Sequence, residues 1–250
     1  MFKTALKEYI DSGISRRKFI AAMSAAGFSG LSARSVADDF TPFVARPGAG
    51  ETSMPEWARA LQGSGGELLV EQLAAAGHRY LFINPSSGEA PIYDALVDRP
   101  ELQIIQAVHE GALTAMADGY ARASGQTAFV MCARPGLPNA MTQMYNAWKD
   151  YIPMLVLVDD VEVDQLGQDG FEAMDHMGSM TEPMVKWQWS VESAERIPEI
   201  ARRALKFAGT QPRRPVFLAC PDNLLRERAT GAIFEREKFE IQPAMPPEPG

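Results

Sequence analysis

The chain has 250 residues, of which 46% are hydrophobic and 22% are charged, a balance typical of a water-soluble protein with a sizeable buried core. Its formal net charge of -8 argues against binding to nucleic acid or anionic lipid, because both would repel it. Two cysteines, Cys132 and Cys220, lie in separate apolar runs without a CxxC pair. Composition therefore indicates neither a disulfide framework nor a metal site.

The first 37 residues differ from the rest of the chain. SRRKFI at 15–20 precedes a weakly apolar stretch, and Ser35 with Ala37 forms a small-x-small cleavage pattern. This apolar run is too short to span a bilayer, which favours a removed signal over an anchor. The order of these features resembles a twin-arginine export signal with Arg16 and Arg17 as the pair, and this implies export to the periplasm. The alternatives are a helix start that happens to carry two arginines, and a cytoplasmic protein.

The remaining chain divides into three parts. Residues 38–65 are rich in Pro, Gly, Ser and Ala and are predicted to be a linker or an N-terminal arm. Residues 66–229 alternate between helical periodicity and short apolar runs, and residues 230–250 are predicted to be a C-terminal linker. The predicted strands are 79–85, 102–110, 127–133, 153–160 and 213–222, and the predicted helices are 66–77, 91–100, 111–125, 137–151 and 193–209. Apolar strands separated by helices indicate a single open, parallel, doubly wound α/β domain with helices on both faces.

Common nucleotide and hydrolase motifs are missing from this domain. It contains no GxGxxG, GxxxxGK[ST] or GxSxG, and His109 and Glu110 are followed by GAL, so HExxH is excluded too. Ligands of open parallel sheets bind at the carboxyl ends of the strands. The predicted ends are 84–88, 109–111, 133–139 and 159–160, and these define the expected ligand crevice.

Glu110 stands out among these strand ends. It follows the apolar segment LQIIQAV and precedes a predicted helix, so its carboxylate should lie near a helix N-terminus at the sheet edge. The helix dipole favours the charged form there, whereas burial opposes it. Spacing alone favours a structural acid that satisfies free backbone NH groups.

Four stretches, INPSSGEAPIYDAL, VHEGALTAMADGYARASG, PGLPNAMTQMYNAW and PMVKWQWSVESAERIP, suggest a function for Glu110. Their order and spacing resemble the N-terminal, pyrimidine-binding domain of thiamine-diphosphate-dependent enzymes, in the branch of acetolactate synthase and benzoylformate decarboxylase. The resemblance implies that Glu110 is the catalytic glutamate, which hydrogen-bonds the cofactor's pyrimidine. It implies a reaction on a small 2-oxo acid, in which the protein contributes position and electrostatics.

Other positions match this family one by one. Those that match its cofactor-binding positions, besides Glu110, are Pro85, Pro135, Gly136 and Asn139; Ser87 and His109 match its substrate-contacting positions. Arg134 departs from the pattern, because a small residue is expected there. Cys132 stands about where benzoylformate decarboxylase has a catalytic histidine, which departs from that activity.

The resemblance leaves half of the cofactor site unaccounted for. The family binds the diphosphate through Mg²⁺ in a separate domain with a GDG run, and QDGFEAM lacks its first glycine and its later asparagine. We therefore expect no metal ligands here, no activity of the chain alone, and a diphosphate-binding domain or subunit as partner in a homo- or hetero-oligomer. The alternative is a non-catalytic solitary domain that binds or scaffolds a partner.

Overall fold

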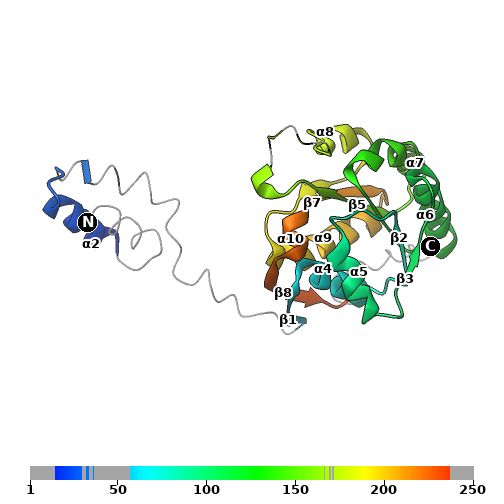
Figure 1. Cartoon of the computed structure of the whole chain (residues 1–250), viewed down its shortest axis with the longest axis horizontal. Coiled ribbons are helices and arrows are strands. Elements are labelled where there is room, and N and C mark those ends of the chain that lie inside the picture. The colour runs from blue at the N-terminus through cyan, green and yellow to red at the C-terminus, as the bar shows by residue number, and fades with distance from the viewer. Residues whose placement is uncertain are drawn as a thin grey trace, which may run out of the picture. The chain divides into compact units, whose positions relative to one another are not determined.

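The computed structural model describes residues 15–29, 32–33, 36, 57–165, 167–168, 170 and 172–236. The chain divides into two compact units, Met1–Ser53 and Met54–Gly250, which are described separately (Figure 1). Predictions for residues 38–56 and 237–250, and for the cleavage pattern at Ser35 and Ala37, fall outside the described residues. No described helix combines the length and the apolar character needed to cross a membrane.

One helix is described in the first unit. Helix α2, Arg16–Ala25, follows the N-cap residue Ser15, whose side chain accepts a hydrogen bond from the backbone NH of Lys18. A serine cap satisfies one of the free NH groups at a helix start, so the helix begins beside the paired arginines. Phe19 and Met23, four residues apart on one helix face, are buried.

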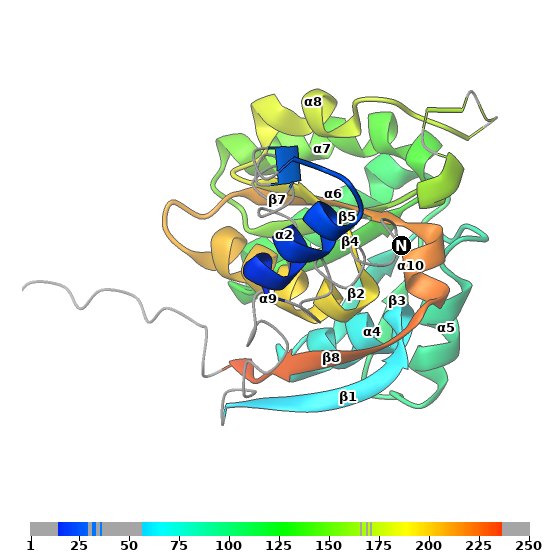
Figure 2. The ribbon, with the colours of Figure 1, turned by 90° about the vertical axis from the view of Figure 1, so that its left-hand side faces the viewer.

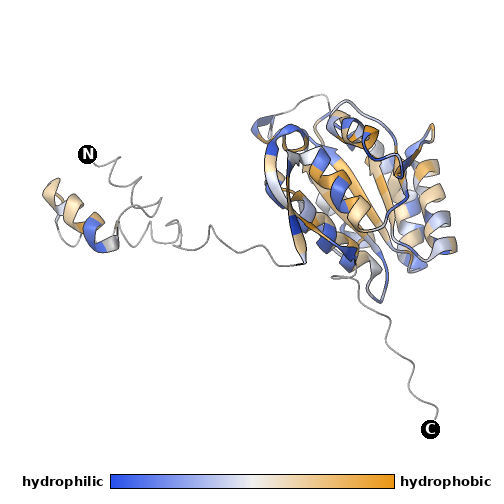
Figure 3. Cartoon of the chain, turned by 90° about the horizontal axis from the view of Figure 1, so that it is seen from below, coloured by the Kyte–Doolittle hydropathy of each residue, from blue (hydrophilic) through white to orange (hydrophobic). Residues whose placement is uncertain are grey.

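A six-stranded parallel sheet forms the centre of the second unit, in the order β3-β2-β4-β5-β7-β6. The strands are β2 Tyr80–Ile83, β3 Gln103–Ile105, β4 Ala128–Cys132, β5 Met154–Asp160, β6 Gln188–Ser190 and β7 Pro215–Pro221. The central strands β4, β5 and β7 are apolar along almost their whole length, as expected when helices cover both faces (Figure 3). This confirms the predicted α/β fold.

Helices cover the sheet on both faces. The helices are α4 Gly65–Ala75, α5 Ala90–Val97, α6 Glu110–Ser124, α7 Leu137–Lys149, α8 Met177–Thr181, α9 Ile197–Gly209 and α10 Asp222–Arg226. On one face of the sheet, α4, α5 and α9 pack against strand side chains such as Leu155 and Leu218. On the other face, α6 and α7 pack against Val156 and Phe217, which are adjacent in sequence to Leu155 and Leu218. Successive strand residues thus enter opposite cores, which places both helix layers.

The domain boundaries differ from the predicted ones at both ends. Strand β1, Ala58–Ser64, pairs antiparallel with β8, Arg228–Phe234, so parts of both predicted linkers belong to the folded domain (Figure 2). Gln72 connects this ribbon to helix α4, because its side chain exchanges two hydrogen bonds with the backbone of Phe234. The two strands of the ribbon contact residues that are distant in sequence. Local periodicity does not predict such contacts, so the sequence did not indicate these strands.

The strand before Glu110 is also shorter than predicted. It was expected to span 102–110, but β3 ends at Ile105, and Val108 is fully exposed. β3 lies at the sheet edge and pairs only with β2, so residues 106–109 leave the sheet before helix α6 begins. Glu110 therefore follows a short connection rather than the strand itself.

Candidate cofactor site

Glu110 is the first residue of helix α6. The imidazole Nδ1 of His109, the N-cap residue, accepts a hydrogen bond from the Gly111 backbone NH at 3.0 Å. His109 thus supplies a cap at this helix start, and the Glu110 carboxylate accepts a hydrogen bond from its own backbone NH as well.

Asn139 holds that carboxylate. Its side-chain amide, in the first turn of α7, donates a hydrogen bond to Oε2 of Glu110 at 2.9 Å. Partial burial raises the pKa of Glu110, but hydrogen bonds from Asn139, from its own backbone and from Asn84 outweigh burial, so the pKa lies below its usual value. The carboxylate is therefore charged at neutral pH and able to accept a hydrogen bond from a ligand.

Gly136 forms a close backbone contact beside Glu110. A Cβ atom at this position would lie 2.6 Å from Cγ and 2.7 Å from Oε1 of Glu110. The short 3-10 helix η2, Arg134–Gly136, leads directly into α7, so Pro135, Gly136 and Asn139 come from one turn and the helix start after it. Only a residue without a side chain leaves Glu110 in its present place.

The turn after β2 reaches the same site through one side chain. Asn84 contributes a hydrogen bond to Glu110, and its Oδ1 accepts one from the backbone NH of Ala107 at 3.4 Å. Pro85 and Ser87, the two predicted residues of this turn, are exposed. Asn84 had not been assigned to the cofactor site, although its place at a strand end was the signal for it.

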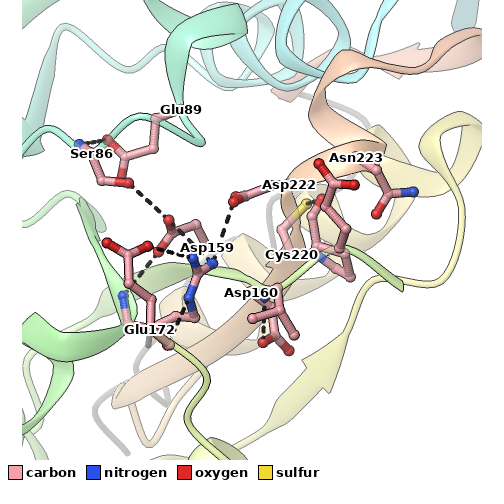
Figure 4. A network of polar contacts seen from close by, with 12 residues as sticks. Ser86, Glu89, Asp159, Asp160, Glu172, Cys220, Asp222 and Asn223 are labelled. Carbon is pink, nitrogen blue, oxygen red and sulfur yellow. Dashed lines mark hydrogen bonds and ion pairs between the residues drawn. The ribbon is translucent and has the colours of Figure 1, made fainter. Parts of the chain in front are cut away.

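A buried ion-pair network lies at the same edge of the sheet (Figure 4). The side chain of Arg134 is only 5% exposed, and its guanidinium contacts Asp159 and Asp222 at 3.4 Å each and Glu172 at 3.0 Å. The backbone NH of Arg134 also donates to Oδ1 of Asp159 at 2.9 Å, and Ser86 Oγ donates to Oδ2 at 2.9 Å. Arg134 therefore connects the ends of β4, β5 and β7. Asp159 also connects this network to the turn after β2, through its hydrogen bond from Ser86.

Glu89 is another fully buried acid of this region. Its Oε2 accepts hydrogen bonds from the Ser86 backbone NH at 3.0 Å and from the Tyr93 hydroxyl at 3.1 Å, whereas Oε1 has no hydrogen-bond partner among the residues that the structure describes. Burial raises the pKa of Glu89 to about 8, and the nearby charges of Asp159 and Asp222 add to the rise. Glu89 is therefore largely protonated at neutral pH.

Sequence reasoning missed this network. Positions 159–160 were noted only as one of the strand ends of the expected ligand crevice, and Arg134 only as a departure from a family pattern. The available signal was a charged residue at the end of each of two strands, Arg134 after β4 and Asp159 in β5. Charges that are buried at the same edge of a sheet need a partner of opposite sign. Cys132 is buried in β4, where burial raises its thiol pKa, so it does not offer a thiolate to this edge.

The predicted cofactor residues fit the pyrimidine half of thiamine diphosphate. Glu110 presents a charged carboxylate held by Asn139, and the absence of a side chain at Gly136 lets this carboxylate lie against the backbone. A carboxylate fixed in this way can accept a hydrogen bond from a ring nitrogen. Among the described residues, no group of three or more His, Cys, Asp or Glu side chains could hold a metal ion.

Comparisons with known proteins agree with this geometry. Residues 63–179 match the family described as "Thiamine pyrophosphate enzyme, N-terminal TPP binding domain". The acetolactate synthase large subunit of Buchnera aphidicola is 35% identical over 165 residues, 66% of this chain and 29% of that protein. Benzoylformate decarboxylase of Pseudomonas aeruginosa is 32% identical over 181 residues, 72% of this chain and 34% of that protein.

A solved structure shares the fold. The thiamine diphosphate-dependent 4-hydroxybenzoylformate decarboxylase of Rhodococcus jostii RHA1 superposes with a TM-score of 0.62 at 27% identity, over 66% of this chain and 31% of that one. This chain spans about a third of the length of these relatives. The folded part of the chain is an N-terminal thiamine-diphosphate-binding domain of the acetolactate synthase and decarboxylase type.

Proposed function

We propose that Glu110 binds the aminopyrimidine of thiamine diphosphate and that the chain works within a 2-oxo acid decarboxylase or carboligase. The single observation that carries this is the Glu110 carboxylate, held charged by Asn139 beside the bare backbone of Gly136. When bound, the cofactor's thiazolium supplies the electron sink that decarboxylation of a 2-oxo acid needs. Glu110 holds a proton at a pyrimidine nitrogen, and Asn139 fixes the carboxylate for that purpose.

We further propose that a diphosphate-binding domain or subunit completes the site and brings Mg²⁺. Support comes from the relatives, which are about three times as long as the matched region. Of the predicted substrate contacts, exposed Ser87 would face that partner, while the ring of His109 is engaged at the helix cap. In this proposal the chain alone has no turnover.

The role of Glu110 is tested in the assembled enzyme. Glu110→Gln keeps the size of the side chain but removes its charge, so we expect turnover of a 2-oxo acid to fall by roughly 10²- to 10⁴-fold. The measurement is turnover of the chain expressed together with a diphosphate-binding subunit, with thiamine diphosphate and Mg²⁺ present. Glu101→Gln, a change at an exposed glutamate outside the site, serves as control. Full activity of Glu110→Gln would remove the proposed role.

A second candidate function follows from the Arg134 network. Arg134 places a large, buried side chain where the family resemblance led to the expectation of a small one, and this favours a non-catalytic domain that binds or scaffolds a partner. Calorimetric titration with thiamine diphosphate and Mg²⁺, with and without the diphosphate-binding subunit, separates the two functions. Cofactor binding that appears only in the complex supports the enzyme, and its absence in both supports the scaffold.

We also propose that residues 1–37 direct export by the twin-arginine route. Support comes from SRRKFI and from helix α2, which begins at the arginine pair. We expect residues 1–37 to carry a folded reporter to the periplasm and Arg16→Lys with Arg17→Lys to stop this, although the charge is unchanged. Cell fractionation measures it, with Lys3→Arg and Lys7→Arg as the matched pair of charge-conserving changes. Equal export of both variants would contradict the proposal.

A further inference from the structure

Three aromatic side chains, Trp187, Trp189 and Phe207, form an aromatic stack at the β6 edge of the sheet, on the face that helix α9 covers. The two indoles are nearly parallel, with ring centroids 6.1 Å apart. Phe207, in the last turn of α9, lies against Trp187 with a centroid distance of 5.2 Å. Trp189 is 40% exposed and Phe207 is 39% exposed. Apolar surface gathered in this way marks a place where another segment binds.

The aromatic stack is held in place from below by Lys186. Its Nζ donates hydrogen bonds to the backbone carbonyls of Phe207, Thr210 and Pro212 at 3.0, 2.7 and 3.1 Å. These bonds fix the start of β6 to the end of α9. Among the described strands β6 pairs only with β7, and natural proteins commonly cover such an edge with a helix or a loop. The aromatic stack and the edge beside it are therefore a pre-organised surface for a covering segment.

The last described strand runs towards this surface. Strand β8 follows α9 in the same direction, because a Cβ atom at Gly231 would lie 3.1 Å from Cγ of Pro198, and the guanidinium carbon of Arg202 lies 4.6 Å from the ring centroid of Phe234. Phe207 follows five residues after Arg202, about 8 Å further along the helix at 1.5 Å per residue. The segment after β8 therefore starts beside the helix that carries part of the aromatic stack.

Residues 237–250 have the length and composition for this surface. The ten residues 237–246 span about 31 Å in a polyproline II conformation, whereas a helix is only about 10 Å across. Four prolines among residues 243–249 favour that conformation, which aromatic surfaces bind. Residues 237–250 contain three acids and one lysine, whereas α9 contains three basic residues and one acid, so the charges are complementary.

We propose that residues 237–250 cross the outer face of α9 and dock their proline-rich part, residues 243–249, on the aromatic stack. The pyrrolidine rings lie against the indole of Trp189 and the ring of Phe207, and remove both from water. The docked segment also covers the edge of the sheet at β6. Nothing in this docking depends on thiamine diphosphate.

A nitroxide label on the segment tests the docking in the full chain. The label is attached to Met245→Cys, since the native Cys132 and Cys220 are buried. In proton–nitrogen correlation spectra we expect the indole NH signals of Trp187 and Trp189 to lose most of their intensity, compared with the same chain after reduction of the nitroxide. The backbone amides of α6, on the other face of the sheet, should keep theirs. Equal intensities of the indole signals before and after reduction would overturn the proposal.

Two variants of the labelled chain locate the contact. Phe207→Ser, and separately Pro246→Ser with Pro247→Ser, should each lower the ratio of docked to undocked segment about tenfold, so the indole signals recover. The proline variant changes no residue of the described domain, and circular dichroism establishes that Phe207→Ser is folded. Tyr145→Ser, a change at an exposed aromatic residue of α7, is the matched control and should leave the signals weak. Unchanged signal loss in both the Phe207 and the proline variants would refute the assigned contact.

A mixing experiment distinguishes docking within one chain from docking on a second copy. Isotope-labelled chain without nitroxide is mixed in equal amount with nitroxide-labelled chain that carries no isotope. Docking within one chain predicts that the indole signals of Trp187 and Trp189 stay unchanged in the mixture. Loss of these signals in the mixture would assign the aromatic stack to a second copy and overturn the proposal.

Discussion

Replacement of Arg134 by methionine is expected to lower the free energy of unfolding by about 3 to 5 kcal/mol. The substitution keeps much of the side-chain volume but removes the cation between Asp159 and Asp222, whose side chains are 1% and 13% exposed. Removing one partner of a buried ion pair leaves the other partner buried and charged without compensation. The resulting loss of stability is larger than the net stabilisation that the pair provides. Glu172 adds little to the loss, because it is 48% exposed and solvent screens its charge.

Urea unfolding of matched variants measures this effect. Arg134→Lys retains the charge but not the planar fork, so its loss should be smaller than that of Arg134→Met. The double variant Arg134→Met with Asp159→Asn should recover part of the stability, because one uncompensated charge is removed with its partner. Arg203→Met, at an exposed position of helix α9, is the control for loss of an arginine. A loss below 1 kcal/mol for Arg134→Met would show that the network is not electrostatically important.

Glu89→Gln is expected to remove a pH dependence of about 4 kcal/mol between pH 5 and 8.5. The pKa of Glu89 is about 8 in the folded domain, compared with an ordinary value of 4.5. Between these values the folded state holds a proton that the unfolded state has released, so stability falls as the pH rises and levels off above about 8. Glutamine resembles the protonated form and stays neutral throughout.

The comparison is made between the free energies of unfolding at pH 5 and pH 8.5. The parent should lose about 4 kcal/mol more than Glu89→Gln over this interval, and the two chains should be similar at pH 5. Asp222, whose pKa burial raises to about 6, contributes a decline of the same sign in both chains. Glu192→Gln, at an exposed position, should follow the parent. Parallel pH profiles for the parent and Glu89→Gln would mean that Glu89 is charged in the folded domain.

The sequence was sufficient for the central strands of the main sheet, because these are apolar on both faces, whereas the edge strand β6, Gln188–Ser190, was not among the predicted strands. Met154–Asp160 and Pro215–Pro221 are recognisable from composition alone, and the helices between strands follow from their periodicity. Glu110 was also placed correctly at a helix start. The cap supplied by His109 was not predictable, because it depends on how the imidazole of that residue is oriented.

The features that escaped prediction depend on pairing over long distances. Arg134 meets Asp159, Glu172 and Asp222 across 25, 38 and 88 positions of sequence. β1 reads ARALQGS, which carries little strand character by itself and becomes a strand by pairing with β8. Such contacts cannot be predicted from the order of residues along the chain. They form because the sheet topology brings the carboxyl ends of β4, β5 and β7 together.

The antiparallel ribbon of β1 and β8 has a consequence for the architecture of larger proteins. Ala58 lies opposite Phe234, so the polypeptide enters and leaves the folded domain at points about 5 Å apart. When the first and last residues of a domain lie close together, the domain can be inserted into a surface loop of another protein without moving the two ends of that loop apart. Fusion of other segments beyond the outer ends of this ribbon therefore leaves the Glu110 site and the Arg134 network together in one folded unit.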